Sequence, residues 1–282
     1  MSKLFFTIVV KCLFLLPAGV GQDIVQTLEL AGNYRERGMF EAAAGHYRRV
    51  IFFGSDSIQA ATFPRLAECQ IMAGNYRDAV FFYGLAANTT PSDSLRAEYT
   101  YMRVLAHLLD DDPGPALQQL LSVPEQENPY FRKKTSFYMG VIHMHRQEGE
   151  AARQYFMEAT ADSLALDGIS RLFDQAGLEH PDPERARRLS MFFPGLGQAY
   201  AGDRRGALNS FILVGALGAL AGYTAFHYSL LEGFLSVVPW LTRYYLGGSQ
   251  HAGNTAWEIR TGKYQGLLLE LIEIFEEEKQ SS

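Results

Sequence analysis

Residues 74–79 read GNYRDA, and residues 38–43 carry a related pattern, GMFEAA, 36 residues earlier. The alanines that end these two stretches have counterparts at steps of 37 and 36 residues, which gives the series Ala43, Ala79, Ala116 and Ala152. Four residues after each alanine comes a large side chain: Tyr47, Tyr83, Leu120 and Phe156. A small residue lets two helices approach closely, and the large residue one turn later fills the gap between them. Such pairs bury their faces only against neighbouring copies, so the repeat predicts four stacked helix pairs.

The turn inside each pair is marked by a glycine in the first two copies, as at Gly74. Asp112 and Pro113 take this place in the third copy, because proline suits the first turn of a helix. In the fourth copy the glycine is missing or displaced to Gly149. Over residues 23–161 the pattern resembles the tetratricopeptide repeat family, most clearly in the second copy through Leu66, Ala67, Gly74, Tyr76, Ala79, Tyr83, Ala86 and Pro91.

The resemblance implies an α-solenoid with a concave surface that binds a peptide or a partner protein. Helical spacing places six residues on or near the inner faces of the first helices, and they form a candidate groove: Arg35, Glu68, Met72, Tyr101, Met144 and His145. These residues include both charged and apolar groups, so they do not identify a ligand. Residues 162–190 are predicted to form a helical cap or linker after the repeats.

The first 22 residues have the pattern of a signal peptide. Lys3 precedes an apolar stretch that runs to Leu16, and Pro17 and small residues follow before Gln22. The alternatives are an uncleaved signal anchor and an ordinary buried helix. The signal reading predicts export of the repeats from the cytoplasm.

Residues 206–231 contain no Asp, Glu, Lys or Arg, and this span of 26 residues is long enough to cross a bilayer. A second apolar stretch, 234–246, contains Arg243 and is rich in aromatic residues, as at a membrane interface. We therefore predict a transmembrane helical hairpin over 206–259 that contacts lipid through 206–246. The alternative is a pair of buried helices in a soluble domain.

Between the repeats and the hairpin, residues 191–205 contain a junction motif, PGLGQAYAG. It resembles a motif of bacterial membrane proteins that have a two-helix transmembrane domain, some of which also carry tetratricopeptide repeats. Proline and glycine prevent a continuous helix, so the motif predicts an interfacial or re-entrant turn that seats the hairpin. No strand precedes it and the lysine of a P-loop is missing, which argues against a phosphate cradle. The motif residues are Pro194, Gly195, Gly197, Gln198, Tyr200 and Gly202.

The last segment, 260–282, has apolar residues at helical spacing and an acidic face, which predicts an amphipathic helix packed on protein. The predicted fold is therefore all-α: a tetratricopeptide-like α-solenoid, then a transmembrane helical hairpin, then this amphipathic helix. A cap that is only solvated and a helix that binds a partner both remain open for the last segment.

Composition and motifs favour a binding protein over an enzyme. The net charge of −6 and the lack of clustered basic residues argue against nucleic acid. Two cysteines cannot build a four-thiolate zinc site, and His143 and His145 point to different faces of a helix. We found no catalytic or cofactor-binding motif, so we expect no catalytic residue, cofactor or metal.

The sequence thus predicts a non-enzymatic, membrane-tethered tetratricopeptide repeat protein of the bacterial cell envelope that acts as a scaffold or adaptor. It would lie in the inner membrane with its repeats in the periplasm. The alternative is an oligomeric membrane component of an envelope transport or assembly system, with the repeats as regulator.

Overall fold

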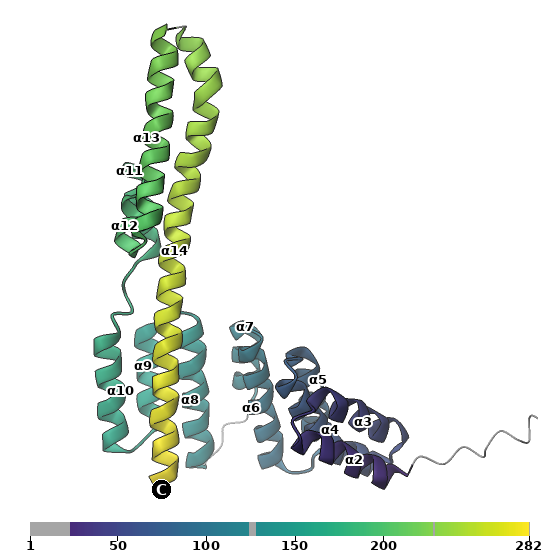
Figure 1. Cartoon of the computed structure of the whole chain (residues 1–282). Coiled ribbons are helices and arrows are strands. Elements are labelled where there is room, and N and C mark those ends of the chain that lie inside the picture. Colours follow the sequence, from purple (N-terminus) through teal and green to yellow (C-terminus); the bar gives the residue numbers. More distant parts are fainter. Residues whose placement is uncertain (1–22, 124–127, 228, 282) are drawn as a thin grey trace, which may run out of the picture. The chain divides into compact units, whose positions relative to one another are not determined.

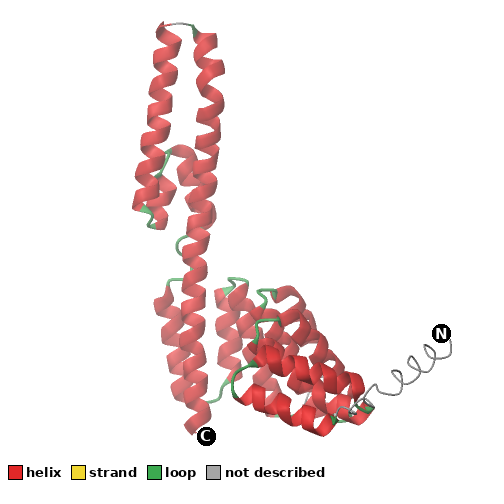
Figure 2. Ribbon diagram, turned by 45° about the vertical axis from the view of Figure 1, so that its right-hand side comes forward, coloured by secondary structure: helices red, strands yellow, loops and turns green. Residues whose placement is uncertain are grey.

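The computed structural model describes residues 23–123, 128–227 and 229–281, which form thirteen helices and contain no strand (Figure 2). The predicted all-α class is confirmed for this part of the chain. The signal peptide predicted at 1–22 lies outside the described residues. The chain divides between Tyr138 and Met139 into two compact units, called here the first and the second unit.

Successive helices pack against their neighbours, as a helical repeat requires. The first unit contains α2 (Ile24–Glu36), α3 (Phe40–Phe53), α4 (Asp56–Met72), α5 (Tyr76–Thr89), α6 (Asp93–Leu109), α7 (Pro113–Leu121) and the start of α8 (Pro129–His145). The second unit contains the end of α8 and then α9 (Gly149–Ala159), α10 (Ser163–Ala176), α11 (Pro183–Phe192), α12 (Leu196–Ala201), α13 (Arg204–His227) and α14 (Leu230–Ser281) (Figure 1).

The repeat residues form the core of the helix pairs. All four repeat alanines are completely buried, and the large residues that follow them are at most 4% exposed. In the fourth copy Gly140 takes the small position, and a methyl group added there would lie 3.0 Å from the ring of Phe156. The period of 36 to 37 residues in the sequence is therefore a period of packing, one helix pair per copy.

The four turns share one backbone conformation. Gly38, Gly74, Asp111 and Gln147 all have positive φ, between 55° and 76°. At Gly74 the amide donates to a carbonyl three residues back at 3.0 Å, the next amide donates to Gln70 at 2.8 Å, and the other three turns repeat this pattern. Of the two alternatives for the fourth copy, the missing glycine is confirmed and the displacement to Gly149 is wrong, because Gln147 makes the turn and Gly149 is the first residue of α9.

Helix α14 is a single helix of 52 residues that contains Pro239. Its first part lies beside α13, and its last part packs against α10 (Figure 1). The sequence predicted two separate segments here, a membrane helix ending near 259 and an amphipathic helix from 260. The structure joins them without a break in the helix.

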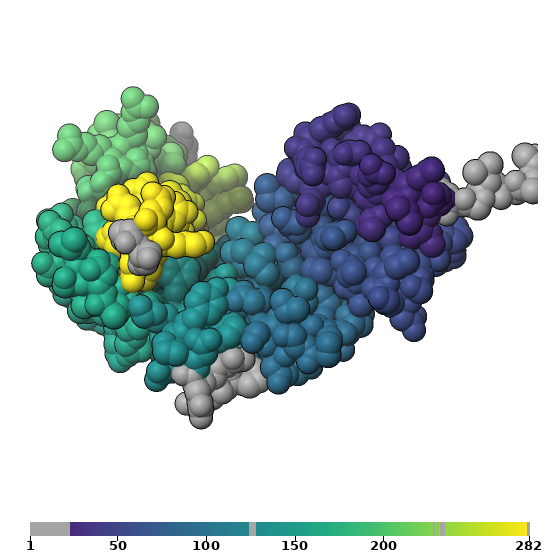
Figure 3. Space-filling view, turned by 90° about the horizontal axis from the view of Figure 1, so that it is seen from below, coloured from purple at the N-terminus to yellow at the C-terminus, as the bar shows by residue number. Residues whose placement is uncertain are grey.

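The last part of α14 docks on the fourth repeat, within the second unit (Figure 3). Leu267 and Leu271 are buried, and the hydroxyl of Tyr264 donates to the carbonyl of Gln147 at 2.8 Å. Nearer its end, Thr160 donates to the carboxylate of Glu278 at 2.7 Å. The amphipathic segment thus packs on protein, as the sequence predicts.

Candidate functional site

The junction motif folds into the short helix α12, which lies against α11, α13 and α14. Small residues of three of these helices (Ala186, Ala201, Ala252 and Ala256) form a buried cluster. The predicted interfacial turn is thus a six-residue helix inside a helical bundle. We call this bundle the hairpin seat.

Gln198 joins the helices of the hairpin seat through its completely buried side-chain amide. The hydroxyl of Ser190, on α11, donates to its Oε1 at 2.7 Å. Its Nε2 donates to the hydroxyl of Ser210, on α13, at 3.1 Å and to the carbonyl of Gly248, on α14, at 2.9 Å. A buried amide with all these bonds made specifies one arrangement of the helices, because any other arrangement leaves polar groups unpaired.

Each glycine of the motif has its own structural reason. Gly195 has φ of 91°, and a side chain there would meet the carbonyl of Ala207 at 2.2 Å. A side chain at Gly197 would overlap the carbonyl of Ala186. Gly202 has φ of 100° and makes the tight turn that leads into α13. Three close approaches or left-handed positions in eight residues explain the glycine content without a phosphate ligand.

Tyr200 anchors the loop that precedes α11. Its hydroxyl accepts a hydrogen bond from the backbone amide of Asp182 at 3.1 Å and lies 3.2 Å from Nδ1 of His180. The guanidinium of Arg185 lies over its ring, 5.3 Å from the centroid. Pro194, at the start of the motif, is half-buried. Gln198 and the three glycines thus contribute to the hairpin seat, and Tyr200 holds the loop before α11.

Helix α13 exposes its apolar side chains. Among the described residues it is the helix that is long and apolar enough to cross a membrane, and none of its most apolar window is buried. Soluble proteins rarely expose contiguous apolar patches of this kind, which mark membrane or protein contacts. The large apolar residues exposed on α13 are Leu208, Phe211, Ile212, Leu213, Leu220, Tyr223 and Phe226.

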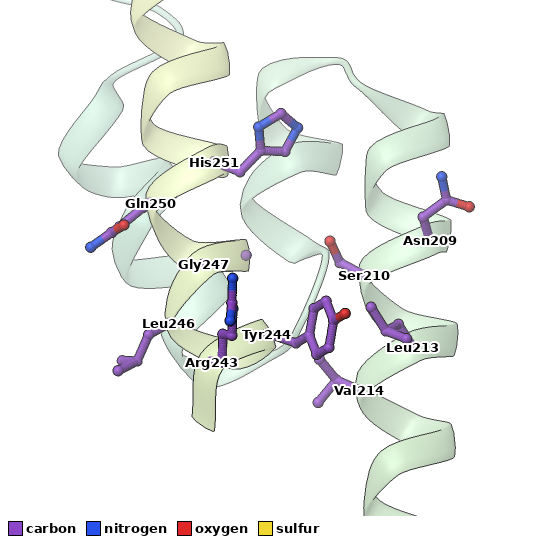
Figure 4. A pocket seen from close by; sticks show the side chains of 11 residues that line it. Asn209, Ser210, Leu213, Val214, Arg243, Tyr244, Leu246, Gly247, Gln250 and His251 are labelled. Atoms are coloured by element: carbon purple, nitrogen blue, oxygen red, sulfur yellow. The ribbon is translucent and has the colours of Figure 1, made fainter. Parts of the chain in front are cut away.

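A cleft of about 540 Å³ opens between α13 and α14 beside the hairpin seat (Figure 4). Its polar lining includes Asn209 and Ser210 on α13 and Arg243 and His251 on α14. Sequence reasoning missed this cleft. The pair Gly247 and Gly248 was the available signal, because two adjacent residues without side chains leave room beside a helix.

A second groove, of about 690 Å³, lies between α10 and the last part of α14. Its lining includes the apolar side chains of Leu172 and Ile274 and the basic side chain of Arg171. Five carboxylates line it: Asp162, Glu270, Glu273, Glu277 and Glu278. We call it the acidic groove. The described residues contain no group of three or more His, Cys, Asp or Glu that could hold a metal ion.

The structure separates the residues of the candidate partner-binding groove. Arg35 and Glu68 lie together as an ion pair at 2.9 Å on the surface of the first unit, and Met72 is 58% exposed. Tyr101 is completely buried, and its hydroxyl donates to the carbonyl of Phe131 at 3.1 Å.

Two further groove candidates, Met144 and His145, belong to the second unit. Met144 is 2% exposed, and His145 is half-buried. The placement of Tyr101 and Met144 in a binding groove is therefore wrong, because both side chains fill the helical core.

No protein-family model, no curated protein and no solved structure matches this chain.

Proposed function

We propose that this chain is a non-enzymatic, membrane-tethered adaptor of the bacterial cell envelope whose tetratricopeptide-like repeats bind a partner protein. The observation that carries the proposal is the exposed apolar surface of α13. The 24 residues of α13 extend over about 36 Å, and a bilayer's hydrocarbon core is about 30 Å thick.

In this proposal the first part of α14, which packs beside α13, completes the membrane hairpin. A hairpin brings the start of α13 and the continuation of α14 to the same side of the bilayer. The last part of α14 docks on the fourth repeat through Tyr264 and Gln147. The fourth repeat and the end of α14 therefore share one side.

We assign that side to the periplasm of the inner membrane. The signal predicted at residues 1–22 acts first, and the first apolar segment usually dominates orientation. The basic residues Arg204 and Arg205 at the start of α13 favour the opposite side through the positive-inside tendency. An alkaline phosphatase fused after Ser282 is active only in the periplasm, so its activity tests this assignment directly.

The repeats and the acidic groove support the adaptor role. Four helix pairs with the same turn at each step agree with the tetratricopeptide resemblance. The lining of the acidic groove combines apolar side chains with five carboxylates, which suits a basic amphipathic segment of a partner protein.

The membrane tether is tested with matched pairs of lysine substitutions at exposed leucine and isoleucine residues. The double variant Ile212→Lys, Leu220→Lys places two charges on α13, each of which costs about 2.5–3.5 kcal/mol near the centre of a membrane helix. The control, Leu164→Lys with Leu269→Lys, changes two exposed residues on α10 and the last part of α14. After carbonate extraction we expect the first variant in the supernatant and the control in the membrane. Equal retention of both would refute the tether.

One observation favours the second candidate, an oligomeric membrane component. Gly218 and Gly222 form a GxxxG pair on α13, and a side chain added at either would meet no atom within 4 Å. Such small residues let a second membrane helix approach closely. A discrete homo-oligomer in detergent that Gly218→Leu dissociates would favour this candidate, and a monomer that co-purifies with another protein would favour the adaptor.

A further inference from the structure

We infer that the cleft between α13 and α14 binds the phosphate group of an anionic phospholipid. This inference rests on the proposed membrane tether, and it identifies a ligand for the polar end of the cleft. The cleft is open on one side and measures about 540 Å³.

The opening exists because α14 carries two adjacent glycines where it passes α13. A side chain added at Gly247 would meet no atom within 4 Å, so the space beside it is empty. At Gly248 an added side chain would lie 3.9 Å from the hydroxyl of Ser210 and 4.0 Å from Nε2 of Gln198. The back of the cleft is therefore the hydrogen-bonded centre of the hairpin seat, which holds its walls in place.

Arg243 supplies the charge. It lies within the apolar part of α14, and its side chain is exposed. Among the described residues it forms no ion pair. In Figure 4 its guanidinium points along α14 toward Gly247, away from the level of Val214. An arginine in an apolar helix extends its head toward the interface, and a guanidinium binds a phosphate through two parallel hydrogen bonds.

One histidine lines the cleft, and one carboxylate lies near it. His251 lies at the polar end, where its Nε2 is 4.0 Å from the carboxylate of Asp203. That carboxylate also accepts the amide of Gly206 at 2.8 Å, as the cap of α13. The carboxylate of Asp203 thus already has Gly206 and His251 as neighbours. The residues that line the cleft include no carboxylate.

The side chains change from polar to apolar along the cleft, as along a lipid. Asn209 and Ser210 precede Leu213 and Val214 on α13, in the direction of the apolar span (Figure 4). A phosphate near Arg243 would have its acyl chains beside the exposed apolar surface of α13. A free phosphate ion makes no use of that apolar end, and this favours the lipid as the source of the group.

The experiment measures lipid retained by the full chain purified in detergent, by native mass spectrometry. The probes are dioleoyl phosphatidylglycerol, dioleoyl phosphatidylcholine and inorganic phosphate. We expect wild type to retain phosphatidylglycerol at least tenfold more tightly than phosphatidylcholine. Millimolar inorganic phosphate should not displace it. Displacement, or equal retention of the two lipids, would overturn the inference.

Two variants locate the site. Gly247→Leu fills the cleft and Arg243→Gln removes its charge, and each should lower phosphatidylglycerol retention at least tenfold. Gly262→Leu, at another open position on α14, and Arg204→Gln are the matched controls and should retain it. Unchanged retention in both cleft variants would place the lipid elsewhere and refute the site. The second variant keeps the test valid if Gly247→Leu does not fold.

The same variants separate this inference from the proposed function. Each is also fractionated, and the cleft variants should stay in the membrane because the apolar surface of α13 is intact. Membrane retention together with normal lipid binding in both cleft variants would refute the lipid site and leave the tether standing. Wild type in the soluble fraction would refute the tether itself.

Discussion

Replacing Gln198 with leucine should loosen the hairpin seat more than any exposed substitution on the same helices. The amide of Gln198 is completely buried and makes hydrogen bonds to Ser190, Ser210 and Gly248, on three different helices. Leucine has a similar size but makes none of these bonds. The variant therefore tests polar connection at nearly constant volume.

The expected magnitude follows from the bonds lost. Each of the three hydrogen bonds contributes about 1 kcal/mol net, so the free energy of unfolding of the second unit should fall by about 3 kcal/mol. For a unit of this size 1 kcal/mol lowers the melting temperature by about 3 °C, which gives a decrease of about 9 °C. The hydroxyl of Ser190 keeps one partner, because it still accepts the amide of Gly197 at 3.0 Å.

The assay is thermal unfolding of the full chain in detergent, followed by circular dichroism. Gln265→Leu is the matched control, because Gln265 is an exposed residue of α14, and it should change stability by less than about 0.5 kcal/mol. Ser210→Ala in the Gln198→Leu background should cost less than it does alone, since its bond to Gln198 is already gone. Equal melting temperatures for Gln198→Leu and Gln265→Leu would refute the role of Gln198 in joining the helices.

Two further predictions concern the repeats. Gly74→Ala should destabilise the first unit by about 1–2 kcal/mol in chemical denaturation, because φ at Gly74 is 76°. The control Gly45→Ala, in the exposed middle of α3, should stabilise the unit by up to about 1 kcal/mol. A change of the same sign in the free energy of unfolding of both variants would contradict the role of Gly74 in the turn. Burial raises the pKa of the Cys69 thiol to about 11. A Cys12→Ser variant, in which Cys69 is the one remaining cysteine, should therefore resist Ellman's reagent at pH 8 while native and react only on unfolding. Fast labelling of the native variant would show that the Cys69 thiol is not in the core.

The repeat could be predicted from sequence because its signal is local and recurs. Each alanine and the large residue after it lie one helical turn apart, so a single pair already describes a contact. The turns of the third and fourth copies were harder to predict from sequence. Asp111 and Gln147 adopt a backbone conformation that glycine prefers, and the sequence shows only that glycine is missing there. The backbone hydrogen bonds of the turn, which are the same in all four copies, hold the conformation there whatever the side chain.

The hairpin seat, the cleft and the continuous α14 depend on contacts between distant residues. Gln198 and Gly248 are 50 positions apart, and Gln147 and Tyr264 are 117 apart. Periodicity reports which residues share a face of one helix, but it does not report which other helix covers that face. For the same reason Tyr101 and Met144, which helical spacing assigned to an open surface, turn out to be buried.

The continuous α14 gives the proposed tether a mechanical consequence. The helix is held at the seat where Gln198 bonds Gly248, and at the fourth repeat where Tyr264 bonds Gln147. These two points are 16 residues apart on one helix, which corresponds to about 24 Å. A flexible linker would let the fourth repeat approach the bilayer or move away from it. A helix held at two points would keep that distance constant, so a partner bound at the acidic groove, as proposed, would be held at a set height above the lipid.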